Sequence, residues 1–109
     1  MRTLQLRLAA NHPAAQGHFP GNPIIPGAVL LSTALTAVTS ALQHDFAQCR
    51  VSSAKFPSPA RPGDCVDVEY TVTDARLVLT CSVASRTVLK AQLAYPAEHD
   101  IAGLRAAQD

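Results

Sequence analysis

The chain has little of what nucleic-acid-binding and metal-binding proteins depend on. It has no tryptophan, aromatic residues make up 5% of its 109 residues, and its formal net charge is +1 at pH 7. Without a stacking platform or a basic stripe, nucleic acid is not an expected partner. Cys49, Cys65 and Cys81 lie far apart and form no Cys-x-x-Cys pair. A disulfide framework and a metal site are therefore disfavoured, no cofactor is expected, and each cysteine is interpreted as a small buried hydrophobe.

Charge is also missing from one long segment. Residues 19–43 contain no Asp, Glu, Lys or Arg, a length that meets the crude criterion for a membrane-spanning helix. The helical part begins only near Pro26, however, and about 15 good helical residues at roughly 1.5 Å each do not reach across a hydrocarbon core of about 30 Å. A buried helix and no membrane span are expected. The first residues alternate and carry charge, so no export signal is expected and the location is predicted to be cytoplasmic.

The pattern of apolar residues predicts one domain of the α+β class. Residues from Gly27 to about Gln43 are apolar on nearly all sides, which is typical of a central, wrapped helix. Residues 11–26 read as a rigid loop, Pro62-Gly63-Asp64 as a turn, and residues beyond Pro96 as a tail. Period-two alternation predicts strands at residues 4–10, 49–56, 66–72, 77–84 and 88–95. About five antiparallel strands in meander order are therefore expected to wrap around one helix, with residues 1–96 as the core of a single 1–109 domain. Hydrophobic residues make up 48% of the chain, so a second subunit is expected to cover part of its surface.

The most constrained segment is Gly17-His18-Phe19-Pro20-Gly21-Asn22-Pro23, which leads into Pro26-Gly27. Proline locks φ and glycine permits close approach, so this loop holds its histidine in a defined place. The helix that follows presents unpaired N–H groups and partial positive charge at its start. An imidazole that titrates near neutral pH beside such a helix start predicts a base next to an oxyanion site.

These motifs resemble a known family. The run from His18 to Pro23 with the following Pro26-Gly27 is similar to the signature of the hotdog-fold 3-hydroxyacyl-[acyl-carrier-protein] dehydratases. Asn11-His12-Pro13 just before it makes the chain most similar to the short dehydratase-like proteins of aryl-polyene pathways. The resemblance covers most of residues 4–96 and includes Ala54-Lys55-Phe56, Arg61-Pro62-Gly63-Asp64 and Leu89-Lys90-Ala91-Gln92-Leu93. It implies a hotdog fold, a dimer whose two sheets join edge to edge, and removal of water from carrier-protein-bound 3-hydroxyacyl thioesters in fatty-acid or polyene synthesis.

The resemblance also implies roles for individual residues. His18 takes the position of the base and Gly27 that of the N–H donor to the thioester carbonyl. In the family a carboxylate about one turn past the Pro-Gly acts as the acid, but here that position is Ser32, followed by Thr33, and no Asp or Glu occurs between His18 and His44. A serine hydroxyl is not a comparable acid, and general acid catalysis typically contributes about 10²–10⁴-fold.

Three accounts of the missing acid stay open. In the first, His18 carries out both proton transfers while Ser32 orients the leaving hydroxyl. In the second, a different hotdog subunit supplies the acid, so that the chain works as a heterodimer and not as a homodimer. In the third, the chain binds acyl groups or supports a partner without catalysis. A hotdog thioesterase is a further alternative, which the missing carboxylate weakens equally.

Other residues complete the expected site. The implied partner is an acyl carrier protein bearing a phosphopantetheine-linked acyl chain, and Arg50, Lys55 and Arg61 are candidates for contact with it. His12, His44 and His99 are interpreted as structural. The residues expected to line the acyl tunnel are Phe19, Pro20, Ile24, Ile25, Pro26, Thr33 and Phe56.

Overall fold

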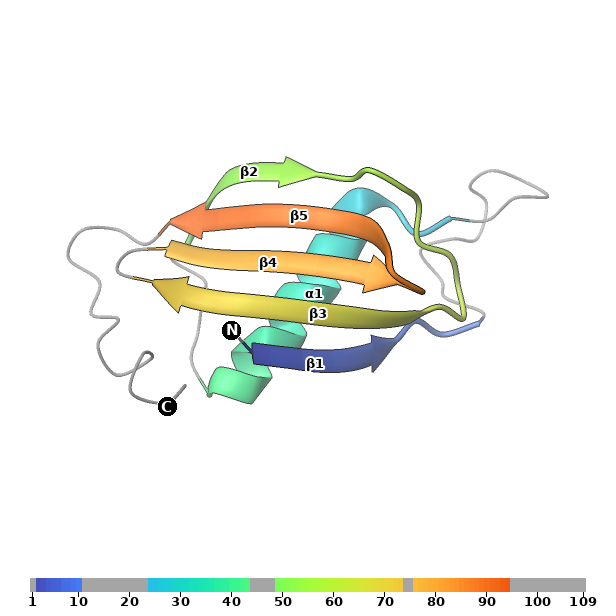
Figure 1. Cartoon of the computed structure of the whole chain (residues 1–109), viewed down its shortest axis with the longest axis horizontal. Coiled ribbons are helices and arrows are strands. Elements are labelled where there is room, and N and C mark those ends of the chain that lie inside the picture. The colour runs from blue at the N-terminus through green and yellow to red at the C-terminus, as the bar shows by residue number, and fades with distance from the viewer. Residues whose placement is uncertain (1, 11–23, 44–48, 74–75, 95–109) are drawn as a thin grey trace.

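The computed structural model describes residues 2–10, 24–43, 49–73 and 76–94. Its elements are β1 (Arg2–Arg7), α1 (Gly27–Leu42), β2 (Arg50–Lys55), β3 (Cys65–Thr73), β4 (Arg76–Val83) and β5 (Arg86–Ala94). The strands form one antiparallel sheet, and α1 crosses one of its faces (Figure 1). The predicted α+β class, with five strands and one long helix, is confirmed.

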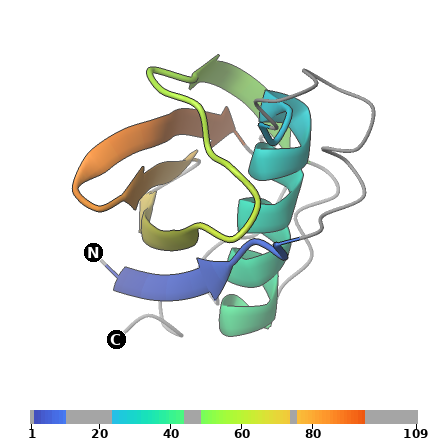
Figure 2. The ribbon, with the colours of Figure 1, turned by 90° about the vertical axis from the view of Figure 1, so that its right-hand side faces the viewer.

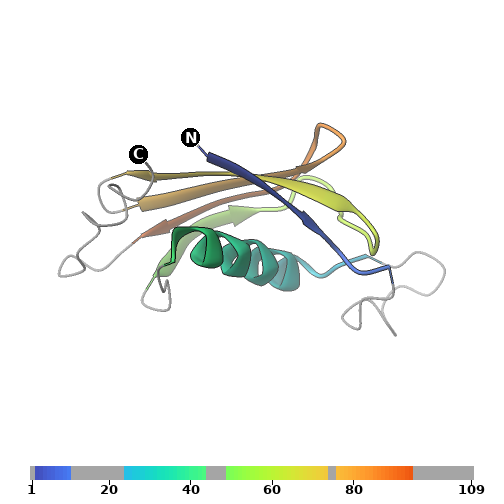
Figure 3. The same cartoon turned by 90° about the horizontal axis from the view of Figure 1, so that it is seen from below.

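The strand order is β1-β3-β4-β5-β2, so the prediction of a simple meander is wrong. Only β3, β4 and β5 follow one another as neighbours. The strand that follows the helix, β2, pairs with β5 at the edge opposite β1. The helix lies between β1 and β2 in the sequence and covers the face of the sheet (Figures 2 and 3), and the chain returns to the sheet only at its far edge.

One stripe of α1 faces the sheet. Its buried residues are spaced by four, so they lie on one side of the helix: Leu30, Ala34, Val38 and Leu42. The predicted central helix is thus packed against the sheet along this stripe. The opposite stripe is small, uncharged and exposed, and consists of Ala28, Ser32, Thr36 and Ser40. The helix ends at Leu42 because Gln43 adopts a left-handed conformation (φ 53°) that cannot continue it.

The core lies between this stripe and the inward face of the sheet. Alternate residues of β3 and β4 point inward, as the period-two pattern predicts. The fully buried side chains include Val66, Val68, Leu77, Leu79, Cys81, Leu89 and Leu93. Cys81 therefore behaves as the predicted small hydrophobe, and burial raises the pKa of its thiol from 9.0 to about 11. The same prediction is wrong for Cys65, which is exposed because it faces outward opposite Arg7, and Cys49 is half-buried.

Two turns between strands contain residues at positive φ. In the predicted Pro62-Gly63-Asp64 turn, the Asp64 N–H donates to the Arg61 carbonyl at 3.1 Å and Gly63 has a φ of 89°. Proline followed by glycine at positive φ is the requirement of a type II turn. The hairpin between β4 and β5 turns at Ala84 and Ser85, and both residues have positive φ.

The two edges of the sheet differ in exposure. On β1, Leu4 and Leu6 are half-buried, whereas all six residues of β2 are exposed. Val51 and Phe56 are the large hydrophobic residues that remain exposed in the described part of the chain, at 46% and 44%. Both belong to the β2 side.

The described part of the chain contains no helix long and apolar enough to cross a membrane.

Candidate functional site

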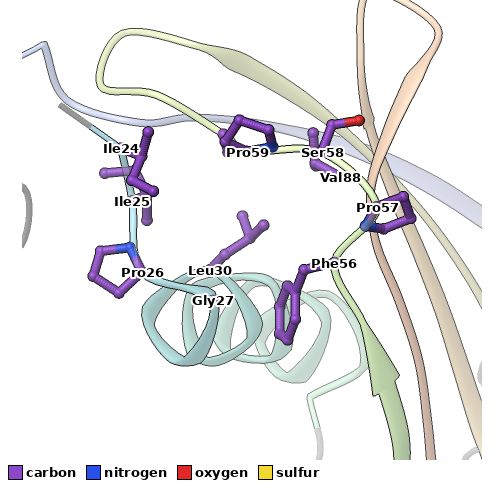
Figure 4. Close-up of a pocket in the computed structure, with 11 residues that line it drawn as sticks. Ile24, Ile25, Pro26, Gly27, Leu30, Phe56, Pro57, Ser58, Pro59 and Val88 are labelled. Carbon is purple, nitrogen blue, oxygen red and sulfur yellow. The ribbon is translucent and has the colours of Figure 1, made fainter. Parts of the chain in front are cut away.

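An apolar pocket of about 680 Å³ lies where α1 begins. Figure 4 shows Ile24 and Ile25 on one side, Phe56 and Pro57 on the other, and Leu30 at the base. The remaining lining residues are Pro26, Gly27, Ser58, Pro59, Ala60 and Val88. None of these eleven side chains is charged, and Ser58 is the one with a polar group. A pocket of this size and character suits an apolar chain.

The first turn of α1 forms part of the pocket wall. Pro26 caps the helix with an extended backbone (φ −55°, ψ 143°) and without a side-chain hydrogen bond. Its carbonyl accepts from the N–H groups of Val29 and Leu30, each at 3.0 Å. The N–H groups of Gly27 and Ala28 precede these and have no acceptor within the helix. Because the first turn carries no acidic residue, its positive end suits a carbonyl oxygen that gains negative charge.

Gly27 is in close contact with Phe56. A Cβ atom on Gly27 would lie 2.9 Å from Cζ of the Phe56 ring and 3.0 Å from Cε1, closer than real Cβ contacts allow. An alanine at position 27 therefore requires the Phe56 ring to shift, whereas no positive φ at Gly27 calls for glycine. The space beside Gly27 is filled by the ring of Phe56, which is itself 44% exposed.

Two polar contacts hold the segment 57–62 across the pocket. Ile25 and Ala60 form an antiparallel bridge in which the Ile25 N–H donates to the Ala60 carbonyl at 2.8 Å. The Arg86 guanidinium donates from Nη1 to the Pro59 carbonyl at 2.8 Å. The proline-rich segment is thus attached at Ile25 to the residues that lead into α1, and at Arg86 to the β4–β5 hairpin.

A β-bulge brings Val88 into the pocket. The register between β4 and β5 shifts between Cys81 and Ser82, where Cys81 pairs with Leu89 and Ser82 with Thr87. Val88 is the extra residue, and Val88 and Leu89 are both buried although they are adjacent. Bulges redirect a side chain in this way. Val88 was not predicted for the site, and the signal that could have found it is the broken alternation at Thr87-Val88-Leu89.

The structure brings together five of the residues predicted for the site: Ile24, Ile25, Pro26, Gly27 and Phe56. It does not bring Ser32 or Thr33 to the pocket of the single chain. Ser32 lies on the exposed stripe of α1, and the Thr33 hydroxyl donates to the Val29 carbonyl at 2.8 Å. His18, Phe19 and Pro20 lie outside the described residues, as do His12, His44 and His99.

The pocket also includes residues that were not predicted for the site, namely Leu30, Pro57, Ser58, Pro59 and Ala60. Three prolines between residues 57 and 62 were the available signal, because so rigid a segment can hold a fixed wall. Arg50, Lys55 and Arg61, the candidate contacts for an acidic partner, are all exposed. The described residues contain no cluster of His, Cys, Asp and Glu suited to a metal ion.

The sequence of the chain matches one protein family and several known dehydratases. The ApeI dehydratase family, ApeI-like, matches residues 1–93. The 3-hydroxyacyl-[acyl-carrier-protein] dehydratase FabZ of Chloroflexus aggregans is 37% identical over 100 residues, which cover 84% of this chain and 67% of that protein. The FabZ protein of Caulobacter sp. (strain K31) is 42% identical over 77 residues, which cover 61% of this chain and 46% of the relative. The chain thus spans about half the length of several curated relatives that it matches.

A solved structure has the same fold. The dehydratase heterocomplex ApeI:P from Xenorhabdus doucetiae matches with a TM-score of 0.65 at 18% identity, covering 84% of this chain and 83% of that one. At this identity the likeness establishes the fold alone. The sheet wrapped around one helix is the hotdog fold, as the sequence motifs predict.

Proposed function

The chain belongs to the ApeI-like dehydratase family, and from this we propose that it removes water from 3-hydroxyacyl thioesters carried by an acyl carrier protein. The observation that carries the proposal is the pocket at the start of α1. Its apolar walls suit an acyl chain, and the first amides of the helix suit the thioester oxygen. The product is a trans-2-enoyl thioester, and the pathway of fatty-acid or polyene synthesis and the cytoplasmic location belong to the same proposal.

The chemistry assigns His18 as the base. Its imidazole removes a proton from the carbon beside the thioester carbonyl, while the Gly27 N–H donates to the carbonyl oxygen as negative charge develops there. The hydroxyl on the next carbon then leaves with a proton, and water and the enoyl thioester are formed. The apolar walls, including Ile24, Ile25 and Phe56, hold the chain so that the two carbons lie beside the helix start.

The acid for the leaving hydroxyl is assigned to one of two sources. His18 returns the proton that it has taken, with Ser32 orienting the hydroxyl across the subunit interface, or a second hotdog subunit places a carboxylate beside His18. Ser32 is exposed on α1, on the side that a second subunit can reach. In either form the functional unit is a dimer, and Phe19 and Pro20 next to His18 complete the substrate-binding residues.

A spectrophotometric assay of crotonyl-thioester hydration tests the proposal. His18→Ala is expected to lower the rate by about 10²-fold or more, because it removes the base. His12→Ala is the matched control, since it removes an imidazole from the same loop and is expected to leave the rate nearly unchanged. Equal rates for the wild type and His18→Ala remove the catalytic assignment.

A second variant addresses the missing acid. Ser32→Glu is expected to raise the hydration rate, because it restores a carboxylate at the family position. Thr36→Glu is the control, as it adds the same charge one turn further along the same exposed stripe. A rise with Thr36→Glu as well would show a general charge effect and refute the assignment of position 32.

A non-catalytic acyl-binding role is the second candidate, because α1 contains no Asp or Glu. It predicts that a non-hydrolysable acyl-pantetheine ligand binds, that no hydration occurs, and that Ser32→Glu does not restore it. The thioesterase alternative predicts release of free thiol from the same substrate, which a thiol reagent detects.

A further inference from the structure

The β4–β5 hairpin supplies two residues to the pocket at the start of α1. Arg86 and Val88 are two positions apart on β5, so their side chains lie on the same face of the strand. Val88 is completely buried and lines the pocket, whereas Arg86 is exposed and donates from Nη1 to the Pro59 carbonyl at 2.8 Å. Figure 4 shows Pro59, Ser58 and Val88 together on the side of the pocket that faces α1. One strand thus provides part of the lining and also holds the lining beside it.

The segment between β2 and Ala60 has few ways of being held in place. Pro57 and Pro59 have no N–H group, so neither can donate to a neighbouring strand. Ala60 is buried and fixed by its backbone bridge, but both prolines are exposed, and the pairing of β2 with β5 ends before them. The carbonyl oxygens are therefore the groups by which this segment is most readily held, and Arg86 donates to one of them.

An arginine on this hairpin suits such a contact. Its guanidinium is planar and permanently charged, so its hydrogen bond to a carbonyl is stronger than a bond between neutral groups. The backbone that carries Arg86 is fixed as well, because Ala84 and Ser85 turn the chain tightly and Val83 pairs with Arg86. The guanidinium therefore joins the proline segment to a well-defined part of the sheet.

We propose that Arg86 is a positioning residue for the pocket. By holding the Pro59 carbonyl, it keeps the wall formed by residues 57–60 close to Val88, and so keeps the pocket narrow enough to contact an apolar chain on both sides. Arg86 does not itself line the pocket, so it acts on binding and not on proton transfer. That the bound chain is the acyl group of a thioester rests on the proposed function, whereas the affinity of the pocket for an apolar ligand does not.

Hydration of 2-enoyl thioesters of N-acetylcysteamine tests the proposal, because this thiol is uncharged and gives Arg86 no charge to attract. Arg86→Ala is expected to raise the KM for an eight-carbon chain about tenfold and to leave kcat within about twofold, since the lost contacts are the same in the ground and transition states. The KM for the four-carbon crotonyl chain is expected to rise about threefold or less, because a short chain buries less apolar area against the wall. Arg86→Lys keeps a charged donor and is expected to restore part of the loss.

Arg76→Ala is the matched control. Arg76 begins β4, is exposed, and donates from Nη1 to Oε1 of Gln92 at 2.7 Å. The variant thus removes the same charge and a similar hydrogen bond from the same pair of strands, outside the pocket. Its KM values are expected to equal those of the wild type. The proposal is overturned if Arg86→Ala leaves KM unchanged, lowers kcat instead, or has no more effect than Arg76→Ala.

Binding of the neutral dye N-phenyl-1-naphthylamine, followed by its fluorescence, gives a readout that needs no catalysis. Arg86→Ala is expected to raise the Kd of the dye about fivefold, because the loosened wall makes fewer apolar contacts, and Arg76→Ala is expected to leave it unchanged. An unchanged Kd in Arg86→Ala refutes the positioning role. If the wild type binds the dye but hydrates no thioester, the dehydratase proposal fails while the effect of Arg86 on the pocket is still measured.

Discussion

The middle of the sheet and its β2 edge are built from similar strands but exclude water to very different degrees. Val68, Leu79 and Leu89 in the middle are fully buried beneath α1, whereas every residue of β2 is exposed. The pocket lies between these regions, with Val88 and Leu30 on its buried side and Phe56 on its open side. The stability of the fold thus depends on the middle strands, and the contacts available to a substrate or partner depend on the open side.

The largest expected effect comes from a cavity in the middle of the sheet. Leu79→Ala is expected to lower the free energy of unfolding by about 2–5 kcal/mol, because Leu79 is completely buried. Val51→Ala on β2 is expected to change it by no more than about 0.5 kcal/mol in the isolated chain. Urea unfolding of both variants measures the difference. Similar losses would contradict the contrast between the two regions.

The pH dependence of stability gives the next largest effect. The thiol of Cys81 has a folded-state pKa of about 11 against 9.0 for an unperturbed thiol, since burial disfavours the thiolate. Below pH 9 the thiol is neutral in both the folded and the unfolded state. As the pH rises from 9 toward 11, the thiol ionises in the unfolded state first, so the free energy of unfolding falls. The expected loss is about 2 kcal/mol.

Unfolding of Cys81→Ala at pH 8 and pH 10.5 checks this loss. The cavity makes this variant less stable than the wild type at both pH values. Between them, however, its free energy of unfolding is expected to fall by about 2 kcal/mol less than that of the wild type. Cys65→Ala is the control, because it removes a thiol from an exposed position. An identical pH profile for Cys81→Ala and the wild type would refute the assignment.

A charge in the pocket separates binding from stability. Ile24→Asp is expected to raise the KM for a crotonyl thioester about tenfold, because a carboxylate opposes entry of an apolar chain. Because Ile24 is only half-buried, its replacement is expected to change the free energy of unfolding by about 1 kcal/mol or less. Val78→Asp on the outer face of the sheet is the control. A loss of stability as large as that of Leu79→Ala would place Ile24 in the core.

The contact between Gly27 and Phe56 predicts a coupled effect of about 1 kcal/mol. Gly27→Ala is expected to destabilise the wild type, because the new Cβ forces the Phe56 ring away. With Phe56→Ala in the same chain, Gly27→Ala is expected to be neutral or stabilising, as alanine favours the helix. A double-mutant cycle by thermal unfolding measures the coupling. Additive effects would refute the contact.

The smallest expected effect lies in the β4–β5 hairpin, away from both regions. Ala84 and Ser85 have φ values of 50° and 68°, conformations that asparagine and glycine adopt more readily. Ala84→Asn with Ser85→Gly is expected to stabilise the protein by about 0.5–1 kcal/mol without changing hydration activity. Thermal unfolding and the crotonyl assay check both statements, and a loss of stability would contradict the turn geometry.

Elements whose pattern is local were predictable. The start of the helix at Gly27 follows from Pro26, and the turn at Gly63 follows from the Pro-Gly pair, because both depend on the backbone preferences of adjacent residues. Val88 was missed because a bulge depends on the register of two strands. The placement of β2 beside β5 was missed for a similar reason, since strand order is a matter of long-range pairing.

The sequence by itself determined the long helix α1, the alternating strands, the apolar character of the helix start and the lack of a carboxylate on α1, because these depend on residue type and spacing. Only the tertiary structure decided that Phe56 packs on Gly27, that the prolines after it form a pocket wall, and that β2 is an exposed cationic edge. These features arise from contacts between residues far apart in the chain. Such contacts are set by packing the whole sheet against one face of the helix, and no local preference encodes them.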